Sequence, residues 1–187
     1  MLMTVIGLGA LGVEALLAGT AAPSPVSPLY REIRDYVVAC DNLRTCRVRW
    51  AEERGDGGFE AYFEVMREGG PGGRLRVTLG GSTVEGTRPD PRTLTVDGLP
   101  FGRDLRWRWN GEAEALVLEG VQALDYVRTL AERDVLTFSD GRQQWPVTLH
   151  GLKASLLAVD EAQGRLGSRG AFVRRGLVTE TGPARSM

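Results

Sequence analysis

Short segments that alternate apolar and polar residues, separated by glycine-rich turns, constrain this chain most. Phe59–Arg67 alternates over nine residues, residues 74–79 alternate cleanly, and a Gly-Gly-Pro-Gly-Gly turn at 69–73 stands between them. Strict alternation places apolar side chains on one face of an extended strand, and glycine and proline mark the turns that reverse it. The pattern predicts antiparallel strands joined by tight turns.

The same pattern recurs along the first two thirds of the chain, and 25 glycines are enough to supply the turns. Seven segments have strand character, at residues 36–40, 46–51, 59–67, 74–79, 93–96, 105–109 and 115–118. Several short strands at close spacing are typical of a sandwich or barrel. We therefore expect a mainly β (α+β) fold, an antiparallel β-sandwich or barrel-like domain.

The period changes in the last third of the chain. Apolar residues fall on one helical face over residues 120–132 and again over 152–163. Between them, residues 134–138 and 144–149 read as strands, the second with an early Pro146 that suits a sheet edge. We expect two amphipathic helices here, a single β-rich domain over residues 35–176, and a flexible tail over 177–187.

The first residues are typical of a secretory signal peptide. Residues 1–13 are apolar or small without a break, and Ala21 and Ala22 are each preceded by a small residue two positions earlier. We expect a signal peptide over 1–22, cleavage near Ala21 or Ala22, and a linker or N-terminal extension over 23–34. The mature protein would then lie in the periplasm or be secreted, with no stable membrane span.

A second interpretation of this start is a nucleotide-binding loop. Gly7–Gly12 has the spacing G-x-G-x-x-G after an apolar pair, which is the dinucleotide-binding signature. A Rossmann unit needs a helix and a second buried strand next, but Pro23, Pro25 and Pro28 stand in that region. We favour the signal peptide, and sequencing the mature N-terminus distinguishes the two.

Cys40 and Cys46 are the only two cysteines. Their spacing is not C-x-x-C, and the single histidine, His150, rules out a site with two imidazoles, so we expect neither metal nor cofactor. In an exported protein such a pair is most simply a structural disulfide, here at the neck of a hairpin. It would close a candidate presented loop of five residues, Asp41, Asn42, Leu43, Arg44 and Thr45.

The stretch Arg106-Trp107-Arg108-Trp109 is a candidate ligand surface. On a strand the arginines and tryptophans point to opposite faces, so the plain interpretation is tryptophan in the core and Arg106 and Arg108 in solvent. A formal net charge of −1 gives no basic excess for nucleic acid.

An enzyme acting on glycans would need two paired carboxylates. Asp134, Asp140, Asp160 and Glu161 are present, but nothing in their spacing pairs them, and no G-x-S-x-G elbow exists. Asp140 fits a turn, and Asp160-Glu161 fits a solvated helix face. We assign no catalytic residue.

Two stretches carry a family resemblance. Residues 36–46, with the pattern strand-A-C-D-N-x-R-x-C, and residues 151–167 with 171–176, containing D-E-x-Q-G-R-x-G, resemble the bacterial family known as domain of unknown function 1176. The resemblance implies an exported envelope protein of Proteobacteria without assigned activity. Members are often about twice this length, so the resemblance covers their first half.

More distantly, the cysteine pair and residues 147–157 are similar to the invasion-associated locus B family, small secreted β-rich proteins linked with host-cell entry. Neither family supplies catalytic residues. We therefore expect an exported β-rich binding or interaction protein, not an enzyme, whose partner is another envelope protein or surface component. An envelope glycan hydrolase and a nucleotide-binding protein built on Gly7–Gly12 remain the alternatives.

Overall fold

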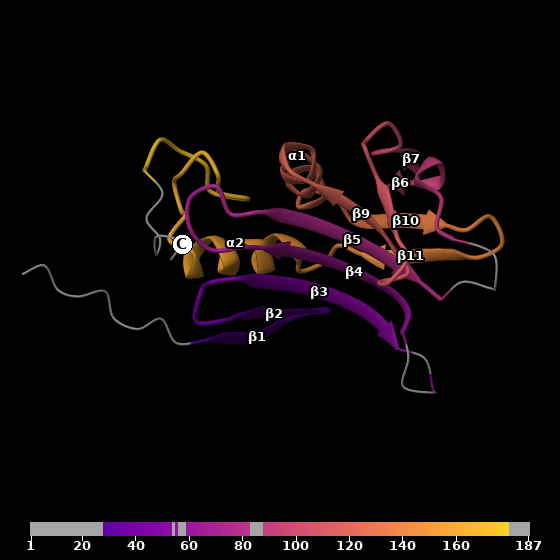
Figure 1. The fold of residues 1–187 in the computed structure, drawn as a ribbon, viewed down its shortest axis with the longest axis horizontal. Coiled ribbons are helices and arrows are strands. Elements are labelled where there is room, and N and C mark those ends of the chain that lie inside the picture. The colour runs from indigo at the N-terminus through magenta and orange to yellow at the C-terminus, as the bar shows by residue number, and fades with distance from the viewer. Residues whose placement is uncertain (1–27, 54, 56–58, 83–87, 180–187) are drawn as a thin grey trace, which may run out of the picture.

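The computed structural model describes residues 28–53, 55, 59–82 and 88–179, and these form two antiparallel sheets and two helices (Figure 1). The larger sheet has seven strands. In spatial order they are β1 (Leu29–Ile33), β2 (Tyr36–Cys40), β3 (Cys46–Glu53), β4 (Phe59–Arg67), β5 (Leu75–Gly81), β9 (Ala115–Glu119) and β8 (Arg108–Asn110).

The smaller sheet has four strands, in the order β11 (Gln144–Thr148), β10 (Val135–Ser139), β6 (Thr95–Val96) and β7 (Leu99–Pro100). A short 3-10 helix, η1 (Pro91–Thr93), precedes β6. Asp90 caps it by accepting a hydrogen bond from the Arg92 N–H. The strand β11 lies at the edge of this sheet, as Pro146 predicts, because proline has no N–H for a further ladder.

Two helices cover one face of the larger sheet. Helix α1 (Val121–Leu130) packs on β5 and β9, and α2 (Leu152–Ala162) packs on β2 and β3. In Figure 1, α2 crosses behind the long strands and α1 lies beside β9. Among the described residues, no helix covers the opposite face of the larger sheet.

The alternation of the strands explains which side chains form the core. Val38, Val48, Phe63 and Val77 are buried on the helix-covered face, one from each of four neighbouring strands. The buried hydroxyl of Tyr36 donates a hydrogen bond of 2.7 Å to the carbonyl of Thr148, which ties β2 to the end of β11.

The two antiparallel sheets and the two helices confirm the expected mainly β fold with two amphipathic helices near the C-terminus.

Most strand and helix ends lie within two residues of the sequence-based expectation, but three differences are larger. Leu29–Ile33, expected in a linker over 23–34, forms the edge strand β1 and pairs with β2, so the cysteine hairpin is the second hairpin of the sheet. At the other end, the N–H of Val178 donates to the carbonyl of Gly167, so ordered pairing continues past residue 176. Of the predicted strand 105–109, only Arg108 and Trp109 pair with β9, and the pairing continues to Asn110. The N–H groups of Leu105 and Trp107 instead bond to carbonyls two or three residues earlier.

Several expectations fall outside the described residues. These are the signal peptide over 1–22, its cleavage near Ala21 or Ala22, the glycine motif Gly7–Gly12, and most of the expected tail. They stay predictions.

Two buried tyrosines predict a loss of stability at alkaline pH. Burial raises the pKa of Tyr36 and of Tyr126 far above the usual value near 10. The two tyrosines contribute fully to the free energy of unfolding below about pH 10. Above that pH the contribution is lost, because tyrosine ionises in the unfolded chain while it stays neutral in the folded protein. Above pH 10, each buried tyrosine should lower the free energy of unfolding by about 1.4 kcal/mol per pH unit. We expect each Tyr→Phe substitution to remove this pH dependence, as measured by urea unfolding at a series of pH values. An unchanged slope in the double variant would contradict this.

Candidate functional site

The two cysteines close the turn between β2 and β3. Cys40 and Cys46 lie directly opposite each other, with their Cα atoms 4.0 Å apart, and form a disulfide. The next pair outward, Asp41 and Thr45, is joined by a backbone hydrogen bond of 3.0 Å. The cysteines therefore occupy a non-hydrogen-bonded pair, where side chains of antiparallel strands are closest. The predicted disulfide at the neck of a hairpin is confirmed.

The loop between the cysteines has a defined shape. The carboxylate of Asp41 accepts hydrogen bonds of 2.8 Å from the N–H groups of both Leu43 and Thr45. Arg44 has a left-handed φ of 60°. Leu43 at the tip is 66% exposed, although it is apolar. The loop thus holds one large apolar side chain in solvent.

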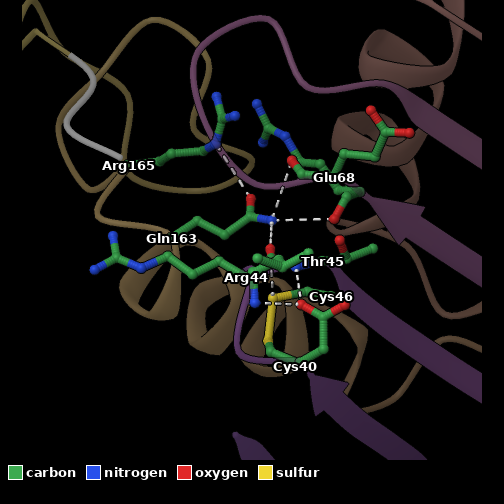
Figure 2. The surroundings of a disulfide bond; sticks show 10 residues. Cys40, Arg44, Thr45, Cys46, Glu68, Gln163 and Arg165 are labelled. Carbon is green, nitrogen blue, oxygen red and sulfur yellow. Dashed lines mark hydrogen bonds between the residues drawn. A yellow bond between two sulfur atoms is a disulfide. The ribbon is translucent and has the colours of Figure 1, made fainter. Parts of the chain in front are cut away.

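The side chain of a buried glutamine, Gln163, bonds to the backbone of this loop (Figure 2). Gln163, directly after α2, is 1% exposed, and its Nε2 donates to the carbonyls of Arg44 at 2.7 Å and Arg67 at 3.1 Å. The same nitrogen lies 3.4 Å from the carbonyl of Glu68. The Nε of buried Arg165 donates to the Gln163 Oε1 at 3.1 Å, which orients the amide.

Asp160 anchors the segment that follows α2. Its side chain is fully buried and accepts hydrogen bonds from the N–H groups of Phe172 at 2.9 Å and Val173 at 3.0 Å. It also forms an ion pair of 3.8 Å with buried Arg67, whose guanidinium lies 4.6 Å from the centroid of the Phe172 ring. Burial raises the pKa of Asp160, and the two N–H donors and Arg67 oppose that rise.

Sequence reasoning placed Asp160 on a solvated helix face, and this is wrong. The residue lies four positions after Leu156, on the apolar face of α2 that packs against the sheet. That spacing was a usable signal, because i and i+4 share a helix face. The neighbouring Glu161 does point to solvent, where its carboxylate lies 3.8 Å from Arg31.

The arginines proposed as a ligand surface do not form one site with the tryptophans. Arg108 pairs with Glu119 across to β9, and Arg106 is exposed. Trp107 is partly buried, with its indole N–H donating to the carbonyl of Gly102 at 2.9 Å and its ring edge-on to Tyr126. Arg106 and Arg108 are exposed as expected, whereas Trp107 and Trp109 are only partly buried and pack against the edge of the core.

A pocket of about 520 Å³ brings part of the carboxylate set beside both tryptophans. Its lining includes Trp107, Trp109, Asp90, Asp140 and Arg92. The guanidinium of Arg92 is 2.8 Å from the Asp90 carboxylate and holds the pKa of Asp90 below its usual range. Asp90 was not among the acids singled out from the sequence, since it is near Asp140 only through the fold.

The other candidate acids are apart from this pocket. Asp134 is exposed and lies 3.5 Å from His150, and Asp160 and Glu161 are on α2. Within the described part of the chain, no three metal-ligating side chains of the His, Cys, Asp or Glu type gather, and none of the helices has the length and apolar character to cross a membrane.

One solved structure has a similar fold. The invasion associated protein B from Bartonella henselae superposes on 73% of this chain and 99% of its own, with a TM-score of 0.51 and 15% sequence identity. At this identity the likeness shows a shared fold only.

Sequence comparison gives a relative without known activity. The uncharacterized protein YpfG of Escherichia coli (strain K12) is 28% identical over 155 residues, which is 80% of this chain and 43% of YpfG. The chain thus spans less than half the length of this relative. The family described as protein of unknown function (DUF1176) matches over residues 30–186. Since this match includes the cysteine hairpin, both helices and the Asp160–Arg165 segment, the chain belongs to the DUF1176 family.

Proposed function

We propose that this protein is an exported envelope protein, periplasmic or secreted, that binds a partner through the loop 41–45 and performs no catalysis. The observation that carries the proposal is the prior ordering of that loop. The disulfide closes the loop, the Asp41 carboxylate accepts hydrogen bonds from N–H groups within it, and the Gln163 amide donates a hydrogen bond to its backbone. A loop that is already ordered loses less conformational entropy on binding.

Two further features support this proposal. Disulfides form and persist mainly in oxidising compartments such as the bacterial periplasm. The exposed apolar side chain of Leu43 suits a pocket on another protein, because buried apolar anchors carry much of the energy of protein interfaces. The partner is another envelope protein or a surface component.

Substitution at the loop tip tests the proposal. We expect Leu43→Ser to reduce recovery of crosslinked partners from the envelope fraction roughly tenfold, as loss of an interface anchor does. Leu99→Ser is the matched control, since Leu99 is 70% exposed on β7, in the other sheet. Recovery is measured by quantitative mass spectrometry. Equal recovery with both variants, or the intact protein in the cytoplasm with free thiols, would contradict the proposal.

An envelope glycan hydrolase is the second candidate, favoured by the pocket that holds Asp90 and Asp140 beside Trp107 and Trp109. In this pocket Asp90 would be the ionised carboxylate of the catalytic pair, and Asp140 would be the general acid that donates a proton to the leaving group. Release of reducing ends from purified envelope glycan by the wild-type protein, abolished in Asp140→Asn, would support this candidate. Absence of release would remove it.

A further inference from the structure

The face of the larger sheet that no helix covers carries a row of cationic and aromatic side chains. On β3, Arg47 and Arg49 point to this face because Val48 and Trp50 point into the core. Arg49 lies opposite Glu64 on β4 in the strand register.

Two adjoining depressions mark this face, and they share Arg47, Arg49 and Glu64. The first has a volume of about 350 Å³, an apolar floor that includes Val37, Ala39, Ala51 and Phe59, and the carboxylates Asp35 and Glu53 in its lining. The second has a volume of about 240 Å³ and is more polar, with Tyr62, Met66, Arg76, Thr78 and Asn110 in its lining. Arg49 therefore stands at the boundary between an apolar and a polar hollow.

The ring of Tyr62 reaches this boundary because Gly80 lies beneath it. A Cβ at Gly80 would approach the ring to 2.0 Å, so only glycine leaves the ring room to lie across β5. The hydroxyl of Tyr62 donates to the carbonyl of Ala113 at 3.0 Å, which holds the ring in place.

Arg49 differs from the other arginines of this face in its partners. Arg47 pairs with Glu64 at 2.8 Å, and both Arg76 and Arg108 pair with Glu119. The guanidinium of Arg49 instead lies over two rings, 4.4 Å from the Phe59 centroid and 5.1 Å from that of Tyr62. Within the described ranges it has no ion pair, and its buried Nε has no acceptor. Because no carboxylate of the described residues pairs with Arg49, its guanidinium is left to form a charge-assisted hydrogen bond with a ligand's carboxylate.

We propose that this face binds an acidic peptide segment, in which the carboxylate of an Asp or Glu residue pairs with Arg49. A guanidinium binds a carboxylate through two parallel hydrogen bonds, and the flanking rings hold it in position. The neighbouring residue of the peptide is apolar and fills the hollow over Val37 and Ala51. The carboxylate of Glu64, which is 15% exposed, accepts a backbone N–H of the peptide.

The charges of the face favour a peptide over a phosphate or an anionic membrane. Glu64 lies between the depressions and repels a doubly charged phosphate more strongly than a single carboxylate. Membrane surfaces are recognised by clusters of four or more exposed lysines or arginines, whereas three of the four arginines here already pair with glutamates. This proposal is independent of the loop 41–45.

Peptide arrays test the proposal with the full chain. The probes are immobilised peptides in a Gly-Ser frame, with two central positions that vary through all twenty amino acids. We expect the bound peptides to carry Asp or Glu next to an aliphatic or aromatic residue. Arg49→Gln is expected to weaken that binding roughly tenfold to a hundredfold, the loss typical of a charge-assisted bond.

Arg106→Gln is the control, since it removes an exposed arginine from the neighbourhood of β8 and is expected to leave binding unchanged. Circular dichroism and urea unfolding of both variants verify that they fold. Binding without an acid-plus-apolar preference, or equal binding by Arg49→Gln and wild type, overturns the proposal. Arg49-dependent binding to vesicles of anionic phospholipid, with no peptide selected, assigns the face to a membrane instead and also overturns it.

Discussion

Replacing Asp160 with alanine is expected to destabilise the protein by roughly 3–5 kcal/mol, the cost typical of breaking a buried ion pair by removing one side chain. Arg67 would remain buried without this carboxylate, and the N–H groups of Phe172 and Val173 would lose their acceptor. The measurement is urea unfolding at neutral pH, followed by far-UV circular dichroism.

The adjacent residue provides the control for this effect. Glu161 is on the same helix and has the same type of charge, but its side chain is 65% exposed and its contact with Arg31 is 3.8 Å long. Glu161→Ala should change the free energy of unfolding by less than about 1 kcal/mol, as for a surface pair. A loss of similar size in both variants would show that Asp160 has no special structural role.

Gln163→Ala is expected to cost at least about 2 kcal/mol of stability and to loosen the disulfide loop. The substitution leaves the carbonyls of Arg44 and Arg67 without this donor in a buried position, and each such loss costs roughly 1–3 kcal/mol. The disulfide stays, so the loop remains closed but loses its support from α2. We expect faster reduction of Cys40–Cys46 by dithiothreitol, measured by thiol alkylation and mass spectrometry.

Gln144→Ala is the matched control for this substitution, since Gln144 is exposed at the start of β11. It should leave both the stability and the reduction rate as in the wild type. If the disulfide of Gln163→Ala is also reduced at the wild-type rate, the Gln163 amide does not order the loop. The loop would then be held only by the disulfide and by Asp41.

Asp160 and Gln163 lie in one of the two sequence patterns that resemble the family, and Gln163 contacts the other. The cysteine hairpin and the Asp160–Arg165 segment are more than a hundred residues apart in sequence, yet Gln163 bonds directly to Arg44 of the loop (Figure 2). Arg165 donates to Gln163 and to the carbonyl of Gly70 in the turn between β4 and β5. Both patterns therefore belong to one structural unit that joins the loop, the turn and the end of α2.

The strands could be predicted because their signal is local. Tyr36–Cys40 and Phe59–Arg67 have the bounds expected from alternation. Successive side chains of a strand point alternately toward the core and away from it, so the apolar residues mark the strand directly. The strand β1 escaped prediction because Leu29–Ile33 is an edge strand with three exposed residues, so its alternation is weak. Its pairing depends on β2, which sequence inspection of 29–33 alone does not show.

The sequence by itself determined the fold class, the strand and helix positions over most of the domain, and the disulfide, because these depend on side-chain period and on cysteine count. Only the tertiary structure decided that Asp160 and Gln163 are buried anchors, that Asp90 and Asp140 line one pocket with both tryptophans, and that Arg49 has aromatic neighbours in place of a carboxylate. The reason is that desolvation and pairing of a polar group depend on atoms distant in sequence, which are brought together only when the sheets and helices pack.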